Sequence, residues 1–188
     1  SIAHTTADYD TAMEAFRRGA RQATHLFNAM PAFTHRAPGV VGAALDNPQC
    51  NVELISDGVH IHGSVVRAVF KMFGAKRVIL ISDTMRAAGM PDGDYTLGGQ
   101  DVKVQGKHAT LADGTLAGSV TDLMSCMKTA VSFGIPLADA VRAAAVNPAR
   151  AIGIFNRVGS LSAGKRANVV ILDRNLDIKD IFFYGVKL

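Results

Sequence analysis

The chain has 188 residues, 48% of them hydrophobic, which is enough for one sizeable core or for one domain with an appendage. Its formal net charge is +4, but Lys and Arg occur singly or in pairs with few aromatic residues between them, and this pattern argues against nucleic-acid binding. No apolar run approaches the roughly 20 residues of a membrane span and no charged-then-apolar leader is present, so we expect a soluble chain without membrane association.

Four short apolar segments are predicted to be strands, and each one ends in polar residues. They are Ile2–Ala3, ending in His4; Ala23–Phe27, carrying His25; a segment from Asn51 through Asp57 to His60 and His62; and Arg77–Asp83. Their β-branched content and nearly continuous hydrophobicity are typical of strands buried on both faces of a parallel sheet.

Helical patterns lie between these strands. Residues 8–20 have acidic residues near their start and Gly19 as a stop, and residues 63–75 have Ser64 as a candidate N-cap and Gly74 as a breaker. Four consecutive βα units predict the C-terminal half of a (β/α)₈ TIM-type barrel, in which the chemistry lies at the C-terminal ends of the strands. A doubly wound sheet is the alternative, but no Gly-rich phosphate loop follows any strand.

The pattern changes after Asp83. Residues 93–119 alternate apolar and polar residues between Gly turns, which predicts a hairpin excursion, and two helices are expected over 119–134 and 137–154, the second broken at Asn147–Pro148. Val169–Leu172 and Ile181–Tyr184 are candidate strands of a small β-sandwich domain. We therefore divide the chain into a partial barrel over 1–157, with closing helices, and a β-sandwich part over 158–188.

Two further features concern the context of the chain. Cys50 and Cys126 form no CxxC pattern, so we expect idle thiols in a reducing compartment such as the cytoplasm rather than a disulfide. The sequence starts at Ser1 directly before an apolar strand, and we expect it to be a processed product or a fragment of a longer chain.

The strand ends carry the candidate catalytic residues. His4 and His25 end neighbouring strands, and neutral imidazoles suit Zn²⁺ or a similar divalent ion, although each could instead be a hydrogen-bonded core or loop histidine. Asp83 follows four apolar residues, where burying a carboxylate is costly unless it has a partner or a task. It could act as a general base beside a metal-bound water, or it could cap the following turn.

Three more polar residues are candidates for substrate binding. Arg36 and His60 could hold a phosphate or a carboxylate through charge-assisted hydrogen bonds, or they could be a solvated loop pair. Asn28 could bind a hydroxyl or a phosphate, although a role in stabilising the turn is equally compatible with its position. His35, His62 and His108 are interpreted as surface residues.

Taken together, these stretches resemble a known family. The segments "HLFNAMPAFTHR", "SDGVHIH", "ILISDTMRAAGMPDGDYTLGG" and "GTLAGS" are similar to the N-acetylglucosamine-6-phosphate deacetylase family of the amidohydrolase superfamily, and the match extends over almost the whole chain. The resemblance implies hydrolysis of the N-acetyl amide of N-acetylglucosamine 6-phosphate to glucosamine 6-phosphate and acetate, in amino-sugar catabolism. It implies a divalent metal, with Zn²⁺ preferred and Fe²⁺ or Co²⁺ as alternatives.

The resemblance also implies roles for individual residues. His4 and His25 would be metal ligands, and Asp83 would be the catalytic acid/base. The sugar phosphate would be contacted by Asn28, Ala29, Arg36 and His60. The sugar pocket would be lined by Leu116, Ala117 and Gly118. Arg36 would reach the neighbouring site of a homodimer. Ala3 departs from the family, which usually has Gly there. The family's metal-binding Glu and its carbonyl-polarising His belong to the N-terminal half of the barrel, so we expect that half as a partner and expect the segment alone to be inactive.

Two other functions remain as alternatives. One is a different amidohydrolase, such as a cyclic amide hydrolase, although Arg36 and His60 suit a phosphate that a cyclic amide lacks. The other is a non-catalytic sugar-phosphate-binding relative. Asp83 argues against this second alternative, because binding alone does not require a proton shuttle.

Overall fold

The computed structural model describes residues 1–188, and its centre is a three-stranded parallel sheet. The order is β1 (Gln22–Ala23), β2 (Asn51–Ile55) and β3 (Val78–Ile81), and Ile2 adds an isolated parallel bridge to Ala23. The four predicted strand positions are therefore confirmed as parallel neighbours in chain order. The first is only a bridge, and the second starts at Gln22 and ends at Ala23, before His25.

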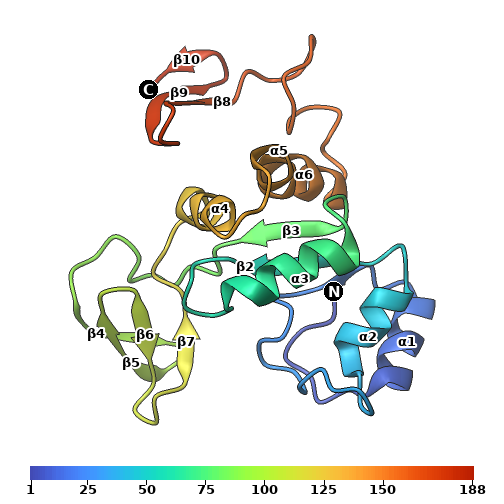
Figure 1. The fold of residues 1–188 in the computed structure, drawn as a ribbon. Coiled ribbons are helices and arrows are strands. Elements are labelled where there is room, and N and C mark those ends of the chain that lie inside the picture. Colours follow the sequence, from blue (N-terminus) through green and yellow to red (C-terminus); the bar gives the residue numbers. More distant parts are fainter.

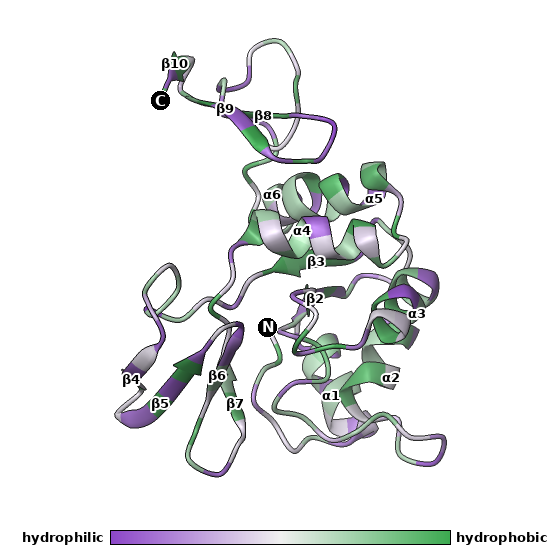
Figure 2. Cartoon of the chain, turned by 60° about the vertical axis from the view of Figure 1, so that its left-hand side comes forward, coloured by the Kyte–Doolittle hydropathy of each residue, from purple (hydrophilic) through white to green (hydrophobic).

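Helices cover this sheet and build the main core (Figure 1). The helices α1 (Tyr9–Arg17) and α2 (Gly39–Asp46) lie together at the lower right, and α3 (Gly63–Phe73) crosses in front of β2. The amphipathic helix α1 buries Ala12 and Phe16, and Asp8 caps it by accepting from the Thr11 N–H, as the acidic start predicted. β3 is hydrophobic along its length (Figure 2), because it is buried among helices.

Helix α2 has no counterpart among the predicted elements. It is buried from its first residue onward, so it lacks the polar face that produces a 3.6-residue period. The buried residues are Gly39, Val40, Val41, Gly42, Ala43 and Ala44.

The start of α3 also differs from the prediction. Its N-cap is His62, whose Nδ1 accepts from the Ser64 N–H at 3.2 Å and lies 2.7 Å from Ser64 Oγ. Ser64 is instead a residue of the first turn, so the prediction of a Ser64 cap is wrong by two residues. Gly74 does end the helix, with φ of 71°.

The excursion after β3 is a four-stranded antiparallel sheet at the lower left of Figure 1. Its strands are β4 (Gly93–Leu97), β5 (Gln100–Gln105), β6 (His108–Thr110) and β7 (Leu116–Gly118). The sheet has a small core of its own, made of Met85, Ala87, Val102, Val104 and Ala109. The predicted excursion is confirmed, as a four-stranded meander rather than a single hairpin.

Three helical segments follow, along the upper side of β3 in Figure 1. They are α4 (Leu123–Ser132), α5 (Leu137–Val141) and, after the π-helical turn Arg142–Val146, α6 (Asn147–Ala151). The predicted break at Asn147–Pro148 is wrong, because the Asn147 N–H donates to the Arg142 carbonyl and the chain stays helical. The wider π turn accommodates the proline ring without a kink.

The C-terminal residues form a second antiparallel sheet in the order β10 (Val186–Lys187), β9 (Ile178–Phe183) and β8 (Val169–Leu172). The predicted strand at Val169–Leu172 is confirmed, and the other predicted strand starts three residues earlier, at Ile178. Most large apolar residues of this C-terminal sheet are exposed, among them Val170, Ile171 and Phe183. None of the helices in the chain has the length and hydrophobicity needed to cross a bilayer.

Candidate active site

His4 and His25 lie against each other at the ends of neighbouring strands. The Ile2–Ala23 bridge sets the two segments side by side, and the ring centroids of the two histidines are 4.7 Å apart with an interplanar angle of 75°. His25 is buried, whereas His4 is exposed. The structure therefore brings together the two histidines that the sequence singled out.

The backbone is strained where the candidate residues lie. His4, His25 and Asp83 have positive φ values of 43°, 33° and 50°, and Ala29 has 50°. A non-glycine residue in the left-handed region is uncommon, and such strain gathers at functional sites, where it aims a side chain that a regular strand would point elsewhere. Three of the candidate strand ends therefore share one backbone conformation, although no contact joins Asp83 to the two histidines within this chain.

The His25 ring also has an unfilled hydrogen-bonding position. Its Nδ1 atom is buried and has no hydrogen-bond partner in the chain, which is costly for a polar atom unless something else satisfies it. A nitrogen with a free lone pair next to a second imidazole suits a divalent cation. No group of three or more His, Cys, Asp or Glu in this chain could hold a metal, so the pair alone does not make a complete metal site.

Asp83 is joined to the end of β7 through the backbone. Its carbonyl accepts a hydrogen bond from the Ser119 N–H at 3.1 Å, and a Cβ on Gly118 would lie 3.6 Å from the same carbonyl. This arrangement places Gly118, the last residue of β7, beside the Asp83 backbone, with Leu116 and Ala117 preceding it in the same strand. The carboxylate itself is exposed in this chain, which contradicts the expectation of a buried group. The reason is that Asp83 lies past the end of β3 and outside the helix-covered core.

The loop after His25 is tied to the loop after His4. The Thr5 N–H donates to the Ala29 carbonyl at 3.0 Å, and the two loops line a depression of about 650 Å³ that includes His4, Ala29 and Met30. Asn28 donates through Nδ2 to the carbonyls of His25 and Leu26, so its side chain stabilises the turn. Arg36 extends from an exposed loop and forms no hydrogen bond or ion pair within the chain.

His60 belongs to a buried pair that sequence reasoning missed. Its Nδ1 lies 2.7 Å from Asp57 Oδ2, and the two side chains are only 5% and 4% exposed. Burial raises the pKa of Asp57, but hydrogen bonds from the His60 ring and from the N–H groups of His60 and Val59 outweigh it and lower the pKa to about 2. The signal in the sequence was an Asp two residues after a buried strand and three residues before a His.

Comparison with known proteins identifies the family of the chain. The model of the amidohydrolase family matches residues 1–187. The chain belongs to the amidohydrolase family. The resemblance noted from the sequence motifs is thereby confirmed.

The relatives are named as deacetylases of amino-sugar phosphates. The chain is 41% identical over 179 residues to N-acetylglucosamine-6-phosphate deacetylase of Bacillus subtilis (strain 168), covering 95% of this chain and 45% of that protein. It is 38% identical to N-acetylgalactosamine-6-phosphate deacetylase of Escherichia coli O157:H7, covering 98% and 49%. The crystal structure of N-acetyl-D-glucosamine-6-phosphate deacetylase from Mycobacterium smegmatis superposes with a TM-score of 0.93 at 39% identity, over 99% of this chain and 50% of that one. The chain thus spans about half the length of these relatives.

Proposed function

We propose that the protein to which this chain belongs hydrolyses the N-acetyl amide of N-acetylglucosamine 6-phosphate, giving glucosamine 6-phosphate and acetate. The observation that carries the proposal is the His4–His25 pair, with its unpartnered Nδ1 atom, at strand ends whose left-handed backbone is shared by Asp83. The names of the relatives supply the substrate class.

We infer that residues 1–157 form the C-terminal half of a (β/α)₈ barrel and that residues 158–188 contribute strands to a small β-sandwich. The parallel strand order and the match to half of a solved deacetylase support this inference. A cavity of about 510 Å³ along the sheet is lined by Gln22, Glu53, Ile79, Ile81, Pro148 and Ile152. In this proposal, the partner that covers it is the N-terminal half of the same barrel.

His4 and His25 would hold the divalent ion, together with a ligand from the other half of the barrel. When bound, such an ion supplies Lewis acidity to the site, and Zn²⁺, Fe²⁺ and Co²⁺ all suit imidazole ligands. Asp83 accepts a proton from the attacking water at a carboxylate oxygen. It returns that proton to the amide nitrogen as the C–N bond breaks, which releases acetate and the free amine.

The remaining candidates bind the sugar phosphate in this proposal. Arg36 and His60 contact the phosphate with Asn28 and Ala29 nearby, and Leu116, Ala117 and Gly118 line the sugar pocket. The extended, unpaired position of Arg36 fits a role in the neighbouring site of a homodimer. A cytoplasmic location remains a prediction, which the two free, buried cysteines support.

A second candidate substrate is N-acetylgalactosamine 6-phosphate, because a relative named for that activity is 38% identical. The two sugars differ only in the configuration of one hydroxyl group, and the chemistry at the amide is the same. The test is acetate release by the complete, Zn²⁺-loaded protein from both phosphorylated sugars and from unphosphorylated N-acetylglucosamine. We expect the highest kcat/KM on N-acetylglucosamine 6-phosphate. If neither of the two phosphorylated sugars releases acetate, the proposal is refuted. That result would favour a non-catalytic binder or a cyclic amide hydrolase.

A further inference from the structure

The loop between β2 and α3 holds Asp57 and His60 in one fixed arrangement. Asp57 Oδ1 accepts from the backbone N–H groups of Val59 and His60, both at 2.9 Å, and this leaves Oδ2 for the imidazole. All the identified partners of this carboxylate are donors within its own loop. The carboxylate therefore fixes both the backbone of the loop and the direction of the His60 ring.

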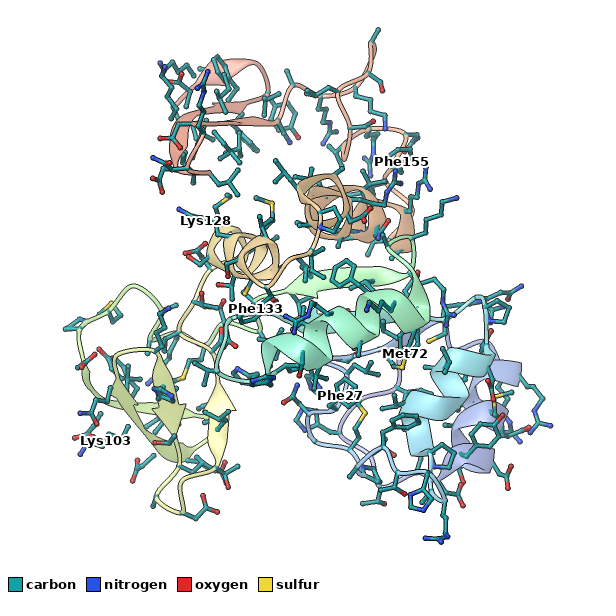
Figure 3. All side chains as sticks on the ribbon, viewed as in Figure 1. Phe27, Met72, Lys103, Lys128, Phe133 and Phe155 are labelled. Atoms are coloured by element: carbon teal, nitrogen blue, oxygen red, sulfur yellow. The ribbon has the colours of Figure 1, made fainter.

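The phenylalanine at the C-cap of α4 packs against this loop. Phe133, labelled in Figure 3, lies between α4 and the start of α3. If Gly63 carried a Cβ atom, that atom would lie only 2.8 Å from the Phe133 ring. A Cβ atom added to Gly58 would lie 3.7 Å from the same ring. The close packing at the two glycines on either side of His60 leaves the loop little freedom to move.

The hydrogen positions on the imidazole follow from this geometry. An ionised carboxylate can only accept, so the Nδ1 atom beside it must carry a hydrogen. The Nε2 atom is left without a hydrogen-bond partner in the chain. It can accept a hydrogen bond when the ring is neutral and can donate one only when the ring is an imidazolium. The other titratable groups around the pair are Lys107 of the β5–β6 turn, Asp122 at the N-cap of α4, and Cys126 of α4.

We propose that Asp57 is a positioning residue for substrate binding: it aims the His60 ring and keeps the hydrogen on Nδ1, so that Nε2 binds an anionic oxygen of the substrate only as an imidazolium. The inference rests on the proposed function, because it takes His60 to contact the sugar phosphate. Asp57 itself touches no substrate. It acts through His60, in the way that the carboxylate of a carboxylate–histidine pair sets the tautomer of the ring.

The test is Asp57→Asn in the complete protein. The asparagine Oδ1 can keep both backbone hydrogen bonds, but its amide group must donate to Nδ1, which moves the hydrogen of a neutral ring to Nε2. We expect KM for the phosphorylated sugar to be about tenfold higher in the variant, because the charge-assisted hydrogen bond is lost, with kcat little changed. In the wild type KM should rise with pH, because Nε2 donates only from the imidazolium, and in the variant this dependence should flatten. Because the charge of the substrate phosphate also changes with pH, wild type and variant are compared at each pH.

Asp173→Asn is the matched control. Asp173 Oδ1 also accepts two backbone N–H groups, from Asn175 and Asp177, but it lies in the C-terminal sheet and contacts no histidine. An Asp57→Asn enzyme with the KM and pH profile of the wild type would overturn the proposal.

A second measurement does not depend on activity. In ¹⁵N-labelled wild-type protein, the two-bond couplings of His60 should show a protonated Nδ1 at neutral pH, and a hydrogen-free Nδ1 would overturn the proposal. Failure of the proposed function is distinguishable, since it would appear as a wild type that releases no acetate. The tautomer measurement would still decide the Asp57–His60 relationship.

Discussion

Ser119 forms an isolated parallel bridge with Thr84 and so holds the backbone of the adjacent Asp83. Its N–H donates to the Asp83 carbonyl at 3.1 Å, its own carbonyl accepts from Met85 at 2.9 Å, and its buried hydroxyl donates to the Ser82 carbonyl. The turn that carries the candidate acid/base is thus attached directly to the strand that precedes Ser119, which is β7. A change in the excursion sheet should therefore affect the position of Asp83.

The first prediction concerns Asp83 itself. Asp83→Asn in the complete protein should keep metal and substrate binding but lower kcat by about 10²- to 10⁴-fold, the usual contribution of general acid–base catalysis. Steady-state kinetics with metal analysis checks this, and Asp101→Asn on exposed β5 is the control. A variant with nearly normal kcat would remove Asp83 from the mechanism.

The second prediction concerns Arg36. Arg36→Ala should reduce kcat/KM for the phosphorylated sugar by about ten- to hundredfold and leave the much weaker reaction of unphosphorylated N-acetylglucosamine nearly unchanged. Arg174→Ala, in the β8–β9 turn, removes an exposed arginine of the C-terminal sheet and serves as the control. Equal losses on both sugars would show that Arg36 does not recognise the phosphate.

The third prediction concerns the chain by itself. Residues 1–188 should neither bind Zn²⁺ stoichiometrically nor hydrolyse the amide, because a catalytic zinc site generally uses three protein ligands and this chain assembles only the His4–His25 pair. Its exposed apolar residues, including Leu161 and Val170, should also promote association. The measurements are bound metal, acetate release and sedimentation. A monomer with one tightly bound zinc and full turnover would contradict the ligand assignment.

The fourth prediction concerns stability at Arg77. Its guanidinium donates to carbonyls at the end of α2 and the start of β2, among them Asn47 and Cys50 at 2.8 Å each, and it lies over the Phe73 ring. Arg77→Ala leaves these carbonyls without their donor, so the free energy of unfolding of the complete protein should fall by about 2–4 kcal/mol in urea titrations. The Arg174→Ala control should change it by less than about 0.5 kcal/mol. A similar small change for Arg77→Ala would mean that water replaces the guanidinium.

Local sequence patterns predicted most of the central sheet but only part of the site. An apolar run that ends in a polar residue is a local signal, which is why β2, β3 and the positions of His4, His25 and Asp83 could be predicted. The buried helix α2 has no amphipathic period, and the π turn before Asn147 depends on two hydrogen bonds from that side chain to the carbonyls of Ala75 and Val78, far away in the sequence. Asp57 was missed because its spacing of three residues before a His is a weak local signal, which becomes informative only once the pair is seen to be buried.

The left-handed backbone at Asp83 implies a trade-off between stability and activity. A residue with a Cβ atom at φ of 50° carries a conformational penalty that glycine avoids. The free energy of unfolding should therefore be about 1 kcal/mol larger for Asp83→Gly than for Asp83→Ala, as measured by denaturant titration. Both variants would lack the proton shuttle. Selection for folding alone would favour glycine at such a turn. If Asp83 is the proton shuttle proposed above, thermal robustness can be gained at this position only by giving up turnover.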